Sequence, residues 1–243
     1  MTNIQKDFFS KYLFYLTEAL KLSNQTVSII SLHALDALNY ILQNKEHLDF
    51  VKILINEIFA IFISLIPTTH LTDLWDLIQE LLNDYFLFFT NKEDVLRNLM
   101  SSLRDRILNE MSKIKNSKIE TNIFINKSWN IIRSASENKY FLPSYVEIME
   151  GQLYPLFELL KDPRQIDFDE DILLLIAEFI KKSQRITSLE KALFKFFGLY
   201  FEKYHFVFGN LFATLNYYIF YGRDFFSNDK QCLNLVFLFC VIF

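Results

Sequence analysis

Histidines and cysteines are the side chains best suited to bind a metal or to act as nucleophiles, so their spacing is considered first. The four histidines are scattered, at His33, His47, His70 and His205. Cys232 and Cys240 lie without the CxxC spacing of zinc sites, and no HExxH sequence is present. We therefore predict no metal site and no disulfide framework, with both thiols free and buried.

Serine and aspartate are plentiful, but the sequence patterns that turn them into catalytic groups are missing. There is no GxSxG elbow, no glycine-rich phosphate loop and no H-R-D set of a kinase. We expect no catalytic, cofactor-binding or metal-binding residues, no cofactor, and a protein that is not an enzyme.

Acidic residues gather in one short segment, at Asp167, Asp169, Glu170 and Asp171. One interpretation is an acidic patch that faces a basic partner. The other is the first turn of a helix, where each negative side chain interacts favourably with the helix dipole by about 0.3–1 kcal/mol. We favour the second interpretation because it requires no partner.

The stretch 141–182 predicts two helices, and the acidic segment lies at the start of the second. Ser144 and Glu147 predict a capping box, followed by apolar residues at helical spacing as far as Leu160. Pro163 ends this helix, and a second one starts at Asp167. Neither helix can bury its apolar stripe alone, so the pair is typical of the unit of an α-solenoid.

Single residues within the helices also have two interpretations. Pro155 follows Gly151 by four residues and predicts a kink, which indicates a curved helix rather than a ligand site. Trp75 and Trp129 are expected to anchor the core or cover it.

Similar signals recur along the whole chain. Thr90 with Glu93 and Thr187 with Glu190 predict two further capping boxes. Loops are expected at 113–122 and 223–229. The remaining helices are expected over the following approximate ranges: from Thr2 to 20, 26–43, 47–66, 74 to 82 or 89, 90–114, 123–137, 187–200, 206–221 and 230–243.

Alternate helices begin near 144, 188 and 229, a spacing of about 41–44 residues that falls within the period of HEAT-type pairs. We therefore predict an all-α fold, an α-solenoid (a right-handed HEAT/ARM-type superhelix) of about five antiparallel helix pairs. Residues 1–243 would form one helical-repeat array.

Composition excludes several classes of protein. Only 4 glycines and 4 prolines in 243 residues argue against a β-rich fold with many tight turns. The net charge is −4 and no block of five basic residues occurs, so we expect no nucleic-acid partner. The longest apolar runs, Ile58–Ile66 and Leu235–Phe243, fall short of the roughly 20 residues of a membrane span, and no signal peptide is evident, so we expect no membrane insertion.

The chain also resembles a known family. The resemblance is carried by an acidic-aromatic start before a long apolar helix, by the helix that follows, and by a further helix up to Leu215–Tyr218. The matching segments read EGQLYPLFELLKDPRQIDFDEDILLLIAEFIKKSQRIT (150–187), SLEKALFKFFGLYFEKYH (188–205) and LYFEKYHFVFGNLFATLNYYI (199–219). They resemble the importin-β (karyopherin) family of nuclear transport receptors, nearest the importin-seven and importin-eight branch. The resemblance is clearest over 72–237.

The resemblance implies a function in nucleocytoplasmic protein transport by non-covalent binding. It implies cargo proteins, basic ones such as ribosomal proteins or histones, and FG-repeat nucleoporins as partners. It implies Ran GTPase as a regulator that acts through N-terminal repeats absent from this chain, which we expect to be a fragment or a shortened paralogue. Nucleus, cytoplasm and nuclear pore are the implied locations. Phe-Gly dipeptides also occur in this chain, at 197–198 and 208–209, where we assign them to core contacts.

A helical-repeat scaffold or adaptor outside the transport pathway is the alternative function. The fold prediction is shared by both, so fold alone does not separate them. Retention on nucleoporin repeats does.

Overall fold

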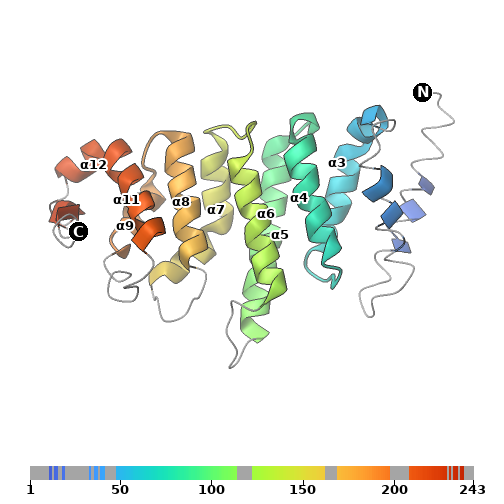
Figure 1. Ribbon diagram of the computed structural model, residues 1–243, viewed down its shortest axis with the longest axis horizontal. Helices are drawn as coiled ribbons and strands as arrows, with labels where there is room; N and C mark the ends of the chain where they lie inside the picture. The colour runs from blue at the N-terminus through green and yellow to red at the C-terminus, as the bar shows by residue number, and fades with distance from the viewer. Residues whose placement is uncertain are drawn as a thin grey trace.

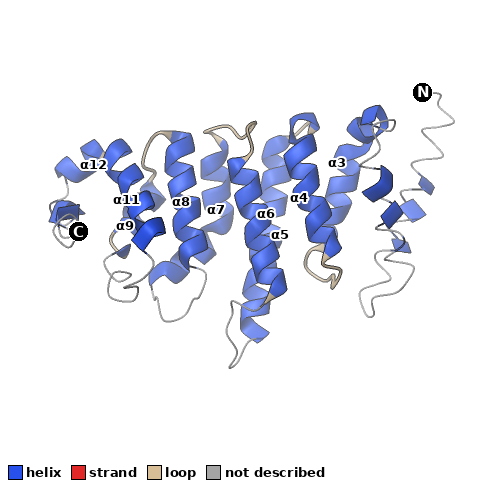
Figure 2. Cartoon of the chain, viewed as in Figure 1, coloured by secondary structure: helices blue, strands red, loops and turns tan. Residues whose placement is uncertain are grey.

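The computed structural model describes residues 48–113, 122–161, 169–197 and 208–228, with single positions between 11 and 41 and between 230 and 237. Within these residues every regular element is a helix and no strand occurs (Figure 2). The all-α prediction is therefore confirmed for this part of the chain. None of the described helices is long and apolar enough to cross a membrane.

The helices follow one another along the long axis of the molecule, with α3 towards one end and α12 towards the other (Figure 1). Short 3₁₀ turns, η2 (Phe86–Phe88) and η4 (Glu158–Lys161), extend the helices before them. The helices of the described residues are α3 (Leu48–Leu65), α4 (Asp73–Tyr85), α5 (Lys92–Lys113), α6 (Ile123–Glu137), α7 (Tyr145–Phe157), α8 (Asp169–Ser183), α9 (Ser188–Phe194), α11 (Phe208–Tyr221) and α12 (Arg223–Asn228).

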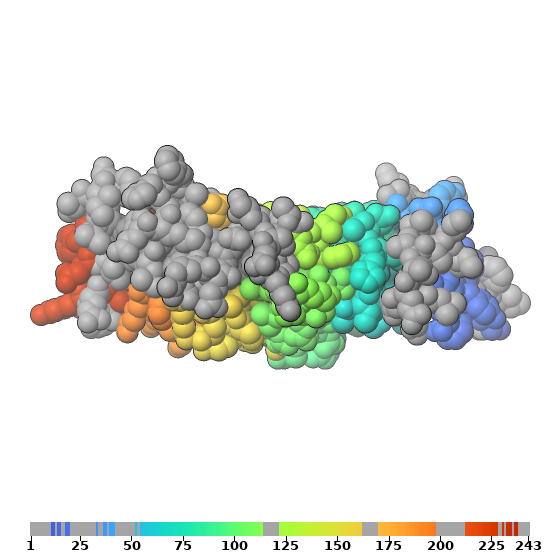
Figure 3. Space-filling view, turned by 90° about the horizontal axis from the view of Figure 1, so that it is seen from below, coloured from blue at the N-terminus to red at the C-terminus, as the bar shows by residue number. Residues whose placement is uncertain are grey.

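Consecutive helices contact each other in pairs, α3 with α4, α5 with α6, and α7 with α8. Helices of neighbouring pairs also contact each other in two rows. One row runs from α3 through α5 to α7, and the other runs from α4 through α6 and α8 to α11. The molecule is therefore a two-layered array, and Figure 3 shows the same elongated outline from below.

The core lies between the two rows and is built from the predicted apolar stripes. Tyr145, Met149 and Leu153 of α7 are buried, and so are Ile172 and Phe179 of α8. Phe157 of α7 meets Phe179 edge to face, with ring centroids 6.3 Å apart. Burial of each such side chain contributes roughly 1.5–3 kcal/mol, so contact between stripes is the main source of cohesion.

Polar side chains fix the spacing of neighbours within a row. In the α4 row, the indole Nε1 of Trp75 donates to Ser128 Oγ at 3.3 Å, and Asn138 Nδ2 donates to the Leu82 carbonyl at 2.7 Å. Further along this row, Thr214 Oγ1 of α11 donates to the Leu173 carbonyl of α8 at 3.0 Å. Each bond joins two helix pairs and therefore sets how the pairs stack.

One of the predicted capping boxes is confirmed in full. Thr187 Oγ1 accepts from the backbone N–H of Glu190, and the Glu190 carboxyl accepts from the backbone N–H of Thr187. Trp75 and Trp129 are buried, as expected. Pro155 lies inside α7, also as expected.

Two other capping predictions are wrong. Ser144 makes no side-chain cap bond because its backbone is already helical, whereas a capping residue is extended, and Glu147 pairs with Arg185. The helix predicted to open at Thr90 begins at Lys92, and its cap is Asn91, whose side-chain oxygen accepts from Asp94 N–H at 3.4 Å. Asparagine and threonine both cap helices by accepting a backbone N–H, so local sequence does not decide between Thr90 and Asn91 as the cap.

Some boundaries differ as well. α4 stops at Tyr85 and only a 3₁₀ turn continues to Phe88. The loop predicted over 223–229 contains α12, and α9 is much shorter than 187–200. The first two predicted helices, the loop over 114–121, Gly198 and the last helix fall wholly or mostly outside the described residues, and the repeat count and the single-array domain stay predictions.

Candidate functional site

A groove lies between α3 and α5, two neighbours in one row. Its volume is about 280 Å³, just below the ~300 Å³ at which small-molecule pockets begin. Phe59, Ala60 and Ile63 of α3 and Val95 of α5 form the apolar part of its lining. This space suits one inserted side chain better than a whole small-molecule substrate.

The rest of the groove lining is polar but uncharged. It consists of Asn56, Ser64, Asn98, Ser101 and Ser102. The Asn56 side-chain oxygen accepts from the Thr90 N–H at 3.1 Å, so the start of the groove is tied to the loop before α5. Amides and hydroxyls both donate and accept hydrogen bonds, which suits them to an extended peptide backbone.

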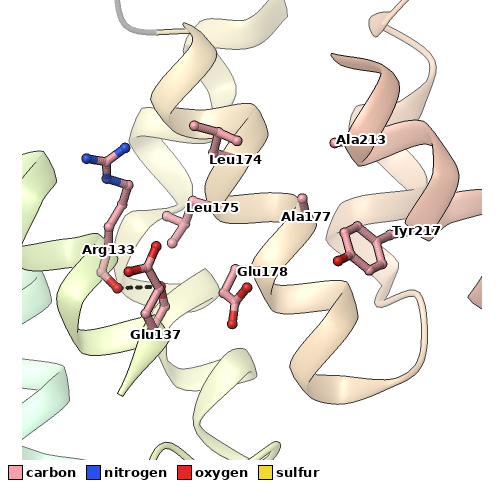
Figure 4. Close-up of a pocket in the computed structure, with 9 residues that line it drawn as sticks. Arg133, Glu137, Leu174, Leu175, Ala177, Glu178, Ala213 and Tyr217 are labelled. Carbon is pink, nitrogen blue, oxygen red and sulfur yellow. Dashed lines mark hydrogen bonds between the residues drawn. The ribbon is translucent and has the colours of Figure 1, made fainter. Parts of the chain in front are cut away.

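A second groove of about 220 Å³ crosses α6, α8 and α11 (Figure 4). Leu174, Ala177, Ala213 and Tyr217 supply apolar surface. In Figure 4 the carboxylates of Glu137 and Glu178 lie on the same side of this groove.

Two lysines of the chain form ion pairs with one of these carboxylates, Glu178. Lys181 Nζ lies 3.0 Å and Lys182 Nζ 3.8 Å from Glu178. Glu178 raises the pKa of Lys181, with smaller contributions from Tyr217 and Glu137. Arg133 lies 3.7 Å from Asp171. Glu178 and Arg133 of the second groove are therefore already paired within the chain.

A pair of buried carboxyls lies where α7 meets α9. Glu150 is 6% and Glu190 1% exposed. Thr187 Oγ1 donates to Glu150 Oε1 at 2.7 Å, and Thr187 N–H donates to Glu190 Oε2 at 2.7 Å. The other Glu190 oxygen, Oε1, is buried with no hydrogen-bond partner within the described part of the chain.

Both buried carboxyls hold their protons more tightly than free glutamate. Burial raises the pKa of Glu150 to about 7, against the opposing effect of the Thr187 hydrogen bond. Burial also raises the pKa of Glu190 to about 8, and the neighbouring Glu150 raises it further. Neither the α3–α5 groove nor the groove across α6, α8 and α11 is lined by Glu150 or Glu190.

The structure also buries an arginine. Arg106 of α5 is 2% exposed, and its guanidinium lies 4.4 Å from the Phe124 ring centroid. Its Nη1 donates to the Pro67 carbonyl at 2.8 Å, and its Nε lies 3.1 Å from Glu110. Burial lowers the pKa of Arg106, while Glu110 opposes that change. The contacts hold the α3–α4 turn against α5.

Sequence reasoning overlooked Glu150 and Arg106, and it predicted Glu190 as a cap but not as a buried carboxyl. Position 150 lies four residues from Val146 and three from Leu153, which are both buried, so helical spacing placed Glu150 on the apolar face. Arg106 likewise precedes Ile107 and follows Leu103 within the buried stripe of α5. A charged residue at a stripe position was the available signal.

The histidines, cysteines and acidic residues named from the sequence do not gather into one site within the described residues. Within the described residues, no group of three or more His, Cys, Asp or Glu side chains could hold a metal ion. His70 is exposed beside Phe124, and Cys232 is a buried thiol. Glu170 and Asp171 lie in the first turn of α8, where Asp171 faces Arg133, while Asp167 lies outside the described residues. That the whole chain has no metal, cofactor or catalytic residue stays a prediction.

Comparison of the chain with protein-family models, with curated proteins and with solved structures found no match.

Proposed function

We propose that this chain is a HEAT-type superhelical array of the importin-β kind and that it serves nucleocytoplasmic protein transport. The observation that carries the proposal is the α3–α5 groove, which is uncharged throughout and has room for one side chain. The family resemblance of residues 72–237 supplies the transport context. Stacking of helix pairs in two rows supports the superhelix.

The lining of the α3–α5 groove suits the Phe-Gly dipeptides of nucleoporins. The apolar surface of Ala60, Ile63 and Val95 would receive the phenylalanine ring, because burial of that ring is favourable by roughly 1.5–3 kcal/mol. Asn56 and Asn98 would bond the peptide on either side, which extended segments require. An uncharged groove does not penalise a neutral peptide by leaving a charge desolvated.

A transport receptor would also bind cargo. The resemblance implies that this cargo consists of basic proteins and that Ran-GTP regulates the receptor. The proposal implies residence in the nucleus, in the cytoplasm and at the nuclear pore. The chemistry on which it depends is non-covalent binding between proteins.

The proposal is tested by retention of the purified chain on immobilised FG-repeat nucleoporin. Asn98 and Asn109 are both exposed asparagines of α5, but only Asn98 lines the groove. Wild type and Asn109→Arg should be retained, while Asn98→Arg should lose retention because the arginine fills the groove and adds charge. Beads carrying the same repeats with Phe replaced by Ser should retain none of them.

The helical-repeat scaffold outside transport predicts a different result. In that case the wild type passes through the FG beads as freely as through the Ser-substituted beads, with or without Ran-GTP. Equal retention of Asn98→Arg and wild type would instead show that another surface binds the repeats and would contradict the α3–α5 assignment.

A further inference from the structure

Two helix pairs are joined through carboxyls that share one threonine. Glu150 comes from α7, while Thr187 and Glu190 begin α9. The Thr187 hydroxyl bonds Glu150, and the Thr187 backbone bonds Glu190, so a single residue holds both acids. Tyr218 of α11 closes the far side, where its hydroxyl donates to the Glu190 carbonyl at 2.8 Å.

Few charged groups face this pair. Glu147 of α7 and Arg185 of the α8–α9 connection act on it from the surface, where they form an ion pair with each other. Within the described residues, Tyr218 and Cys232 are the other titratable neighbours, and burial keeps the pKa of Tyr218 well above its usual value. Arg185 is the one cation among these groups, and its contribution is the smallest on both acids.

We propose that this contact is a proton-dependent joint between the α7–α8 pair and the α9–α11 pair. The joint is closed while the two carboxyls are protonated, and it opens at the α8–α9 connection as they ionise. This inference goes beyond the binding function proposed above and does not depend on it.

The physical reason is the buried oxygen without a partner. When both carboxyls are protonated, Glu190 Oε1 belongs to a neutral group, so its lack of a hydrogen-bond partner costs little. Ionisation of both instead places two negative charges in one buried contact, where burial and their mutual repulsion disfavour them. Hydration of the carboxylates is gained when Thr187 moves away from α7. The residue before the cap region, Gln184, has φ of 54°, so the connection already reverses sharply at the point where the movement would occur.

The direction of the pH effect follows from linkage. Folded-state pKa values of about 7 and about 8 lie above the ordinary value of 4.5, so the closed joint binds more protons than the open one. Its stability is complete below pH 4.5 and falls as pH rises through these values. The opening constant should therefore rise about tenfold per pH unit for each proton released, and level off above pH 8.

Hydrogen–deuterium exchange of residues 184–194 between pH 5.5 and 9 tests the joint. Exchange rates are divided by the intrinsic rate at each pH. In the wild type, protection of this segment should fall at least tenfold between pH 6 and pH 8, while α4 stays protected. Glu190→Gln should lessen the fall, and the double variant Glu150→Gln with Glu190→Gln should abolish it.

The control is Glu137→Gln, an exposed carboxyl of α6, which should behave as wild type. Circular dichroism at each pH checks that the variants stay helical. A wild-type protection profile that does not change with pH overturns the proposal, whatever the variants do. A fall of the same size in the double variant overturns it as well. Neither readout involves nucleoporins, so failure here leaves the groove assignment unaffected.

Discussion

Arg106 is the buried charge with the most contacts in the described residues. It reaches from α5 to the carbonyls of Ile66 and Pro67, lies against Glu110, and covers Phe124. A carboxylate partner offsets only part of the cost of taking a guanidinium out of water, so the carbonyls and the ring must contribute the rest. The residue therefore keeps the α3–α4 turn and α6 in register with α5.

Replacement of Arg106 by Met should lower the free energy of unfolding by about 3 kcal/mol, the lower end of the loss seen when one partner of a buried pair is removed. The lower end applies because Lys113 and Asn122 still bond Glu110. Urea denaturation measures the change. Arg97→Met, on the exposed side of α5, serves as the control and should stay within about 0.5 kcal/mol of wild type.

Helix starts give a second residue-scale contrast. Thr187→Ala should destabilise by about 1–2 kcal/mol, because it removes a cap bond and the bond to Glu150. Ser144→Ala should change little, because Ser144 makes no cap bond. Thermal unfolding of the two variants tests this difference. Equal destabilisation would contradict the assignment of the caps.

The same two residues show how far sequence reasoning reached. Both begin an S/T-x-x-E pattern, and local sequence does not distinguish them. The difference lies in the backbone, which is helical at Ser144 and extended at Thr187, and Glu147 pairs with Arg185, 38 positions away. Helix existence, apolar stripes and the all-α class were predictable from spacing. The buried acid pair and the grooves depend on which helices become neighbours, which spacing does not specify.

At the scale of the elements, two glycines sit in opposite surroundings. A Cβ at Gly151, in the exposed middle of α7, would meet nothing within 4 Å. A Cβ at Gly222, between α11 and α12, would come within 2.4 Å of the Tyr218 carbonyl oxygen and 2.2 Å of Ile186. Only the second glycine is required by close approach of other groups.

Alanine should therefore have opposite effects at the two positions. Gly151→Ala should stabilise by about 0.5–1 kcal/mol through helix propensity. Gly222→Ala should destabilise, because a backbone carbonyl cannot move aside as easily as a side chain. Chemical denaturation gives both values, and a stabilised Gly222→Ala would show that α12 does not join α11 as described.

At the scale of the whole molecule, the described helix pairs make their main contacts with their neighbours along the two rows. In such arrays stability passes from unit to unit. Phe179→Asp in α8 should unfold the α7–α8 pair by placing a charge among Leu156, Phe157 and other buried residues. Exchange protection should be lost in α6 to α11 first, and α3 and α4 should keep theirs.

Asn130→Asp, exposed on α6, is the control for Phe179→Asp and should leave the exchange pattern unchanged. Uniform loss of protection from α3 to α11 in Phe179→Asp would mean that the chain folds as one cooperative globule. That result would count against a repeat array.

The central claim is that the α3–α5 groove holds a neutral aromatic peptide, and photo-crosslinking tests it most directly. A Phe-Gly repeat peptide carrying a photoreactive phenylalanine would be irradiated with the chain, and the modified residues identified by mass spectrometry. The account predicts crosslinks within 56–64 and 95–102, absent in Asn98→Arg and present in Asn109→Arg. Crosslinks confined to the groove of α6, α8 and α11, or none above the level of a Ser-Gly competitor control, would contradict it.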